Sequence, residues 1–366
     1  MKINFKHLSK DEIHGILSEL KAQSYATGQI IDWIYRKSAC SFDDMTNLPK
    51  QLRTQLESIA CISSLTLLKK SVSRDGSQKF LFGLEDNESI ESVLIPNSTG
   101  RDRYTLCVSS QVGCSLGCKF CATGSLGFKR NLFTHEIVDQ VIAVRRIIAR
   151  NQNAACSDDI KKPLSSKSPV ITNIVFMGMG EPLNNYSEVV NALWRLIKFM
   201  DFSKRKITVS TAGVIPGMNM LAKTGPDISL AVSLNATTDE TRNQIMPINR
   251  KYPLKKLIEA CRDYPLSPGR RITFEYVLLG GVNDSTDDAH RLVCLLKGIR
   301  SKINLIPYNS PSHVSDALLK SFDTPDDERV LAFQKILKKA GMTAIIRKSM
   351  GSDIAAACGQ LKAACT

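Results

Sequence analysis

The stretch from Ile171 to Met200, ITNIVFMGMGEPLNNYSEVVNALWRLIKFM, decides the fold. Its first eight residues form an apolar run of the length typical of a buried strand. A glycine-rich turn follows, and from Tyr186 the apolar residues recur with the period of an amphipathic helix. The stretch therefore predicts one unit made of a strand, a turn and a helix.

Similar units lie on both sides of this one. The strand candidates span residues 104–110, 171–178, 205–213, 228–235, 271–279 and 302–309, with a seventh run at 342–349. Helical runs between them span residues 134–150, 186–200, 254–264 and 288–300. Alternation of this kind predicts parallel strands joined by right-handed crossovers, hence an α/β barrel or a doubly wound sheet. In both folds the working residues gather at the carboxyl ends of the strands.

The N-terminal part has a different pattern. Apolar residues with helical spacing occur at 13–23, 30–38 and 48–59. Two alternating runs at 65–73 and 78–85 follow, separated by the turn sequence RDGS, and then the run 91–96. We expect a small helical domain followed by a β-ribbon that ends near residue 98.

The charge balance indicates the class of partner. The chain carries 49 Lys and Arg against 35 Asp and Glu, a formal charge of +14, so a polyanion such as nucleic acid is favoured over a membrane. A merely basic cytoplasmic protein is the alternative. No apolar run reaches the ~18 residues that span a bilayer, and the N-terminus is too polar for a signal peptide, so we expect a cytoplasmic protein without a membrane partner.

A polar segment at residues 151–169 interrupts the alternation after the first long helix. It is rich in Ser, Pro and Lys, which is typical of an exposed insertion. Only the lysines of this segment favour a role in RNA binding.

Eleven cysteines, an odd number, argue against a closed disulfide framework. Three of them lie in CSLGCKFC, residues 114–121, directly after the first barrel strand. Gly113 and Gly117 permit the tight backbone that a metal-binding loop needs. Structural zinc uses four ligands, and no second cysteine pair is present, so a 4Fe-4S cluster with one open iron is favoured over zinc or no metal.

The C-x3-C-x2-C motif with the aromatic Phe120 before its last cysteine resembles that of the radical S-adenosylmethionine (SAM) enzymes. Five segments together resemble more closely the RlmN group of RNA methyltransferases, whose nearest relatives are the Cfr methyltransferases. They are CVSSQVGCSLGCKFCATG (107–124), FMGMGEPLNN (176–185), STAGVIP (210–216), INLIPYNS (303–310) and GSDIAAACGQL (351–361). The resemblance extends from about residue 91 to 361 and is weaker in the N-terminal part.

The resemblance implies three parts of the chain. They are an N-terminal helical RNA-binding module with a β-ribbon (1–98), a partial (β/α)6 radical SAM barrel (99–348), and a C-terminal tail (349–366). It also implies one 4Fe-4S cluster and two SAM molecules per turnover. The implied cluster ligands are Cys114, Cys118 and Cys121. The implied SAM contacts are Gly180, Glu181, Ser210, Ser233, Leu234, Asn235 and Asn309; taken alone, each Ser or Asn would be interpreted as a turn or helix cap.

Three further residues are implied to act on the substrate. Cys358 falls where the family carries a methyl group as S-methylcysteine, Cys107 where it has a second reactive cysteine, and Glu91 where it has a proton acceptor. Without the family they would be a small core residue, an inward-facing strand residue and a surface carboxylate. Two cysteines suit the chemistry, because C2 of adenine is too electron-poor to attack SAM directly, whereas a thiolate can.

The implied mechanism has four stages. Cys358 accepts a methyl group, which loses a hydrogen to a 5′-deoxyadenosyl radical formed from a second SAM. The methylene radical adds to C2 and gives a covalent protein–RNA adduct. Glu91 or Cys107 accepts the C2 proton, and Cys107 attacks the sulfur of Cys358. Methylated RNA is released and a transient disulfide remains, which a reducing cytosol resets.

The implied substrates are adenosine 2503 of 23S ribosomal RNA and adenosine 37 of transfer RNA. A flavodoxin-like electron donor and a monomeric state are also expected. Two alternatives stay open: Cfr-type methylation at C8 of the same ribosomal adenosine, and a non-catalytic RNA-binding module with zinc or an Fe–S cluster.

The sequence departs from the family pattern in several places. Asn235 stands where many members have His. Residues 97–103 are longer than usual, and the 151–169 insertion is extra. Cys365, near the end of the tail, is interpreted as a frayed terminal thiol.

Overall fold

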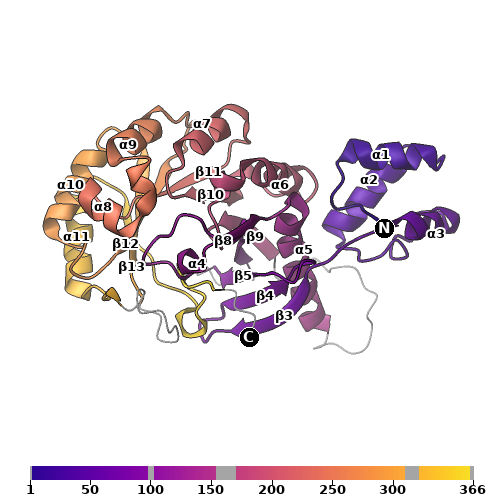
Figure 1. The fold of residues 1–366 in the computed structure, drawn as a ribbon, viewed down its shortest axis with the longest axis horizontal. Coiled ribbons are helices and arrows are strands. Elements are labelled where there is room, and N and C mark those ends of the chain that lie inside the picture. The colour runs from indigo at the N-terminus through magenta and orange to yellow at the C-terminus, as the bar shows by residue number, and fades with distance from the viewer. Residues whose placement is uncertain (1, 98–102, 154–169, 310–320, 363–366) are drawn as a thin grey trace.

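A computed structural model describes residues 2–97, 103–153, 170–309 and 321–362 (Figure 1). Its centre is a ten-stranded sheet in the order β14-β13-β12-β11-β10-β9-β6-β5-β4-β3, so β3 and β14 form its edges. The strands are β3 (Thr66–Val72), β4 (Gln78–Gly83), β5 (Ser89–Pro96), β6 (Arg103–Cys107), β9 (Val170–Phe176), β10 (Ile207–Thr211), β11 (Ser229–Ser233), β12 (Ile272–Leu278), β13 (Ser301–Pro307) and β14 (Ala344–Ile346). All neighbours from β6 to β14 are parallel, which confirms the predicted α/β barrel with open edges.

Helices follow the barrel strands and cover the outside of the sheet (Figure 1). They are α5 (Thr134–Asn153), α6 (Tyr186–Lys198), α7 (Ile215–Thr224), α8 (Asp239–Ile245), α9 (Leu254–Asp263), α10 (Thr286–Leu296) and α11 (Asp327–Lys339). Short 3-10 turns join them: η2 (Pro182–Asn185), η3 (Lys204–Lys206), η4 (Pro247–Arg250) and η6 (Ser352–Ile354). In α6 the buried residues Val189, Ala192, Leu193 and Leu196 form one stripe, as the helical period of the opening stretch predicts.

The two faces of the barrel strands differ in polarity. Val232, Phe274 and Ile303 are aligned across β11, β12 and β13, and all three are fully buried. The next residues, Ser233 and Glu275, are also aligned, and Glu275 faces Asn304 on β13. Parallel strands covered on both faces are apolar throughout, so this alternation indicates a polar inner face at the mouth of the barrel.

The predicted β-ribbon continues the same sheet. β3, β4 and β5 are antiparallel, β5 pairs with β6, and the turn Ser73–Ser77 joins β3 to β4 where RDGS predicts a hairpin. The ribbon therefore extends the barrel sheet toward its β3 edge.

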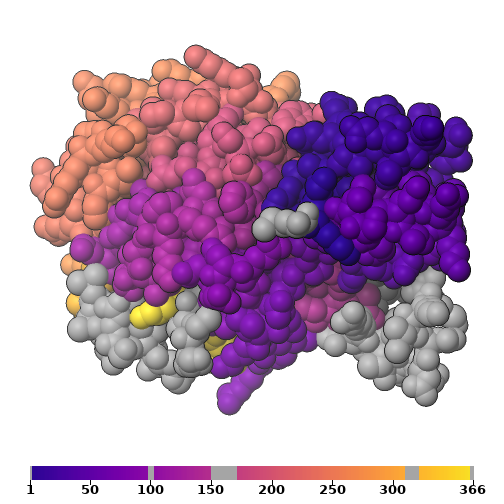
Figure 2. Space-filling model, turned by 45° about the vertical axis from the view of Figure 1, so that its right-hand side comes forward, coloured from indigo at the N-terminus to yellow at the C-terminus, as the bar shows by residue number. Residues whose placement is uncertain are grey.

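The N-terminal module is helical, as predicted. It contains β1 (Ile3–Asn4), α1 (Lys10–Glu19), α2 (Ala26–Ile31), the π-helical turn η1 (Asp32–Arg36), α3 (Lys50–Ile59) and β2 (Ala60–Cys61). Lys6 of this module forms a buried ion pair with Asp139 of α5, and Arg195 of α6 donates to the carbonyl oxygens of His7 and Leu8 at 3.3 and 3.2 Å. These contacts dock the module on the barrel, and Figure 2 shows its indigo side chains against those of the barrel.

Some predictions concern residues outside the described part of the chain. Most of the 151–169 insertion, the extra residues of the 97–103 loop, and Cys365 fall there. The domain limits 1–98, 99–348 and 349–366 stay predictions. Within the described ranges, no helix has the length and apolar character needed to cross a bilayer.

Candidate active site

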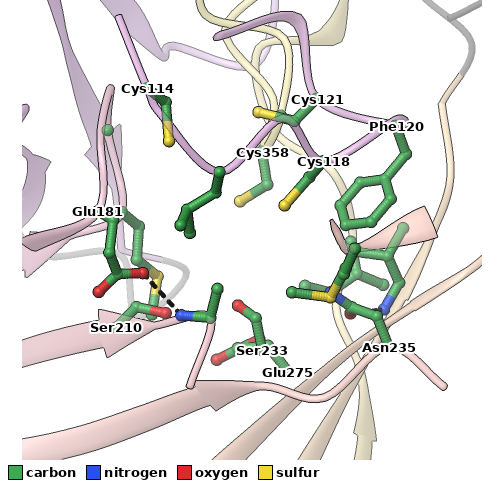
Figure 3. A pocket seen from close by; sticks show the side chains of 18 of the residues that line it. Cys114, Cys118, Phe120, Cys121, Glu181, Ser210, Ser233, Asn235, Glu275 and Cys358 are labelled. Atoms are coloured by element: carbon green, nitrogen blue, oxygen red, sulfur yellow. Dashed lines mark hydrogen bonds between the residues drawn. The ribbon is translucent and has the colours of Figure 1, made fainter. Parts of the chain in front are cut away.

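One cavity lies at the carboxyl ends of the barrel strands, as the fold predicts (Figure 3). Its empty volume is about 1050 Å³, including the open mouth. Ten of the predicted site residues line it: Cys114, Cys118, Cys121, Gly180, Glu181, Ser210, Ser233, Asn235, Asn309 and Cys358. Three do not line it: Glu91, Cys107 and Leu234.

The cysteine loop, residues 114–121, follows β7 (Gln111–Gly113) and leads into the short helix α4 (Ala122–Ser125). Gly113 has a φ of 73°, and a Cβ there would lie 1.9 Å from the carbonyl oxygen of Gly127. This close approach lets the Cys114 N–H donate to the same oxygen at 2.8 Å, just before β8 (Phe128–Asn131) pairs with β7. A glycine is therefore required where the loop begins.

The three thiols of the loop face the cavity in Figure 3. Burial raises the pKa of Cys114 to about 12 and that of Cys118 well above its usual value. A bound cation would reverse this effect, because metal ligation favours the thiolate. Cys114 and Cys118 are therefore thiols at neutral pH in the free protein and would become thiolates on binding a cation.

The number of donors bears on the kind of metal centre. Structural zinc uses four ligands, whereas the loop supplies three cysteines. A 4Fe-4S cluster held by three cysteines keeps one iron open for a further ligand. Three thiols from one loop, all at the cavity, fit such a cluster.

Glu181 caps the turn after β9 and is 3% exposed. Its carboxylate accepts the N–H of Leu183 at 3.1 Å and that of Ala212 at 2.8 Å, the second shown as the dashed line in Figure 3. Burial raises its pKa to about 7. The preceding Gly180 has a φ of 96°, and a Cβ there would lie 2.5 Å from the Cβ of Gln111, so the GMGE turn also needs its glycine.

The SLN segment at the end of β11 divides its side chains between cavity and core. Ser233 faces the cavity, whereas Leu234 is fully buried in the apolar core. Asn235 lines the cavity, but its Oδ1 accepts the N–H of Val277 at 2.8 Å and its Nδ2 lies 3.3 Å from the sulfur of Met246. The main chain of Leu234 is also occupied: its N–H donates to the carbonyl oxygen of Glu275 at 3.0 Å, and its carbonyl oxygen accepts from Nε of Arg242 at 2.9 Å.

The backbone of Asn235 explains its departure from the family pattern. Its φ is 56°, in the left-handed region, where Asn and His are both enriched among non-glycine residues. Asn therefore meets the conformational requirement that His would meet at this position.

The tail carries Cys358 to the cavity from the far end of the chain. The carbonyl oxygens of Gly359 and Leu361 accept hydrogen bonds from Ala122 at 2.6 Å and from Thr123 at 2.7 Å, directly after the cysteine loop. Cys358 faces the cavity beside Cys118 and Cys121 (Figure 3). Its side chain is exposed at the cavity, and desolvation by the surrounding protein, followed by the charge of Glu275, raises its pKa to about 11.

The β3–β4 turn holds the tail from the other side. Asp75 accepts the N–H of Gly351 at 2.7 Å, and Asp353 accepts from the hydroxyl of Ser73 at 2.6 Å and from the N–H of Arg74 at 3.2 Å. We call these contacts the tail clasp. They fix residues 351–353, five to seven positions before Cys358.

Cys107 and Glu91 lie behind the cavity. Cys107, at the end of β6, is 7% exposed, and the charge of Cys358 contributes to its raised pKa, so the two thiols lie within electrostatic range. Glu91 on β5 is 4% exposed; it pairs with Lys79 at 3.0 Å and accepts the N–H of Lys362 at 2.9 Å. The alternative interpretation of Glu91 as a surface carboxylate is therefore wrong.

Two residues of the site were not predicted. Glu275 lines the cavity and accepts from Asn304 at 2.8 Å; a charged residue within the apolar strand sequence ITFEYVL is a signal that could have revealed it. Arg242 is fully buried beneath the cysteine loop, but DETRNQI has the composition of an exposed helix and gives no such signal.

The comparisons with known proteins agree with this geometry. The chain matches the crystal structure of a radical SAM methyltransferase from Sphaerobacter thermophilus with a TM-score of 0.86 and 41% identity, covering 99% of this chain and 100% of that one. The fold is thus that of a radical SAM methyltransferase.

Closer relatives give the family. Residues 3–62 match the family model described as the ribosomal RNA large subunit methyltransferase N-terminal domain. The dual-specificity RNA methyltransferase RlmN of Geobacter sulfurreducens is 49% identical over 98% of this chain and 92% of its own length, and that of Syntrophobacter fumaroxidans is 47% identical over 98% and 97%. The chain belongs to the RlmN family of RNA methyltransferases.

Proposed function

We propose that this protein is a SAM-dependent radical methyltransferase that methylates C2 of adenosine in RNA. The proposed targets are adenosine 2503 of 23S ribosomal RNA and adenosine 37 of transfer RNA. The observation that carries the proposal is that one cavity collects three thiols from a single loop and a fourth, Cys358, from the tail. Membership of the RlmN family supports the choice of substrate.

Cys114, Cys118 and Cys121 would hold one 4Fe-4S cluster. Glu181 would accept the amino group of SAM, with Gly180, Ser210, Ser233, the main chain of Leu234, Asn235 and Asn309 as further contacts. When bound, the cluster and two SAM molecules per turnover supply the methyl group and the one-electron chemistry that activates it. The carboxylate of Glu181, with its pKa near 7 in the free protein, would stay ionised beside a cationic group.

The remaining steps belong to the chain itself. Cys358 would carry the methyl group, because its thiol is the one outside the cysteine loop that faces the cavity in Figure 3. Glu91 would accept the C2 proton. Its carboxylate would first be released from the ion pair with Lys79 or from the hydrogen bond that the N–H of Lys362 in the tail donates to it. Cys107 would attack the sulfur of Cys358 to free the methylated RNA, leaving a transient disulfide.

The proposed partners follow from the same function. The N-terminal module would recognise RNA shape and phosphates, and the target base would be unstacked to reach the cavity. A flavodoxin-like protein would supply electrons, and the enzyme would act as a cytoplasmic monomer.

Nucleoside mass spectrometry tests the proposal. The reconstituted protein is incubated with SAM, a reductant and a 23S ribosomal RNA fragment, and the digested RNA is analysed for methylated adenosines. We expect 2-methyladenosine, and none with Cys358→Ala. Only 8-methyladenosine would contradict the C2 assignment and favour the Cfr-type reaction, and no methylation by a cluster-loaded protein would overturn the function itself.

A further inference from the structure

Arg242 on α8 is fully buried, and its guanidinium bonds to neutral groups alone. Its Nε donates to the carbonyl oxygen of Leu234 at 2.9 Å. Its Nη2 donates to the carbonyl oxygens of Ala212 at 2.7 Å and Ser233 at 3.2 Å, and its Nη1 donates to Oδ1 of Asn249 at 3.0 Å. One side chain thus ties together the carboxyl ends of β10 and β11.

The charge of Arg242 has no carboxylate beside it. Among the described residues, no Asp or Glu carboxylate accepts a hydrogen bond from the guanidinium, and Asp239 acts on it only through its charge. Buried arginines are normally paired with an anion, because desolvation of a lone charge is costly. The pKa of Arg242 falls to about 10 through burial, so the side chain remains a cation at neutral pH. Its counter-charge must come from another source.

The geometry of α8 directs Arg242 toward the cysteine loop. Ile245, three residues further along the same helix face, accepts the N–H of Lys119 at 2.9 Å, and Lys119 follows Cys118 directly. Leu116, Cys118 and Phe120 pack on the apolar cluster that contains Ile245 and Met246. Cys118 is the ionisable group whose charge, when it is a thiolate, acts most strongly on Arg242.

Arg242 also reaches the opposite side of the cavity through one intermediate residue. Ala212, whose carbonyl oxygen accepts from Arg242, uses its N–H to bind the carboxylate of Glu181. Ser233, whose carbonyl oxygen also accepts from the guanidinium of Arg242, lines the cavity. A shift of this guanidinium would therefore move two of the proposed SAM contacts together.

We propose that Arg242 is a positioning residue with two roles: it is the counter-charge of the cluster at Cys118, and its fork fixes the SAM-binding ends of β10 and β11. The inference rests on the proposed cluster. A 4Fe-4S centre with three thiolate ligands is anionic, and gains one more negative charge on reduction. A buried cation beside it therefore favours the reduced state and raises the reduction potential.

The two roles are separable by substitution. Arg242→Gln removes the charge, whereas Arg242→Lys keeps a charge but loses the planar fork that reaches several carbonyls. Arg145→Gln is the matched control. Arg145 is a half-buried arginine of α5 that lies over the ring of Phe202 and does not line the cavity. Burial lowers the pKa of Arg145 to about 10 as well.

The experiment is an EPR-monitored redox titration of each reconstituted protein without RNA, combined with calorimetric titration of SAM. In Arg242→Gln we expect the reduction equilibrium to fall at least tenfold, which lowers the one-electron potential by about 59 mV. Arg242→Lys should keep the potential and lose about tenfold in SAM affinity, through the displaced strand ends. Arg145→Gln should match the wild type in both.

An unchanged potential in Arg242→Gln, or an equal shift in Arg145→Gln, would overturn the counter-charge role. If Arg242→Gln does not fold, the double variant Asn249→Asp/Asp239→Asn decides. It leaves the arginine in place and adds a carboxylate where Oδ1 lies 3.0 Å from Nη1, and it removes the Asp239 carboxylate that Nδ2 of Asn249 contacts at 2.9 Å. Its potential should fall in the same way. The redox titration and the SAM titration are both made without RNA, so neither depends on RNA binding. An unchanged potential together with intact formation of 2-methyladenosine would thus reject this inference and leave the proposed function standing.

Discussion

The cysteine loop and the C-terminal tail bring thiols to the same cavity in different ways. The loop is fixed locally, by a glycine at which an added Cβ would lie 1.9 Å from a backbone oxygen, and by pairing of β7 with β8. The tail has little regular structure and is fixed by residues far away in sequence, both in the β-ribbon, such as Asp75, and in α4. This difference indicates that the cysteine loop takes its shape from its own neighbourhood, whereas placement of Cys358 depends on distant elements.

Removing one thiol from each region should give the largest effects. Both variants should lose methylation, but only the variant in the loop should also lose iron. We expect Cys118→Ala to lose most of the bound iron, and therefore SAM cleavage and methylation, by at least roughly 10³-fold. Cys358→Ala should keep iron and SAM cleavage but lose methylation to a similar extent, because only the methyl carrier is missing. Iron analysis, assay of SAM cleavage and nucleoside mass spectrometry together distinguish the two variants.

Cys294→Ala is the control for this pair, because Cys294 is an exposed thiol of α10 outside the cavity. It should behave as the wild type. Loss of iron in Cys358→Ala would show that the tail is part of the metal centre and would remove the distinction between the regions.

The next largest effect concerns the start of the loop. Gly113→Ala places a Cβ 1.9 Å from a backbone oxygen at a φ of 73°, so we expect roughly 4 kcal/mol of destabilisation and poor cluster loading. Gly117→Ala is the matched control, since its φ of 62° costs about 1–2 kcal/mol but the added Cβ meets nothing within 4 Å. Chemical denaturation and iron content measure both. Equal effects would show that the close approach at Gly127 is unimportant.

The titration of Glu181 gives a third test, on the carboxylate that joins the turn after β9 to the end of β10. Its pKa is about 7 in the folded protein and about 4.5 in the unfolded chain, so the folded state binds more protons between these values and loses stability as pH rises through them. We expect wild type without SAM to lose about 3 kcal/mol of unfolding free energy between pH 4.5 and 8 relative to Glu181→Gln.

Urea denaturation of both proteins across this range measures the difference, and the subtraction cancels the other titrating groups. Parallel pH curves for the two proteins would mean that burial does not perturb this carboxyl group.

The smallest effect is expected at the tail clasp. Asp353→Asn weakens the contacts with Ser73 and Arg74, so the tail should exchange amide hydrogens faster and methylation should fall about three- to tenfold, with iron content unchanged. Asp326→Asn, at the start of α11, removes a carboxylate that caps no backbone group and is the control. A methylation rate that does not change in Asp353→Asn would show that the clasp does not position Cys358.

The same contrast explains what could be predicted from the sequence. The strand–helix units and the three-cysteine loop depend on spacing within a short stretch, so their residues and their place at the strand ends were predictable. The clasp and the contact of Glu91 with Lys362 join residues 271 to 280 positions apart, which no local pattern encodes. Arg242 was missed for a related reason: its burial depends on packing under a distant loop.

The central claim is that two cysteines outside the loop, Cys358 and Cys107, perform the methyl transfer to RNA through a covalent adduct. Cys107→Ala tests it most directly, because the adduct could form on Cys358 but could not be resolved. Denaturing gel electrophoresis and mass spectrometry of cluster-loaded Cys107→Ala, incubated with SAM, reductant and RNA, should reveal RNA linked to the peptide containing Cys358, and Cys107→Ala/Cys358→Ala should show none. Absence of any protein–RNA adduct in cluster-loaded Cys107→Ala that still cleaves SAM would contradict the account.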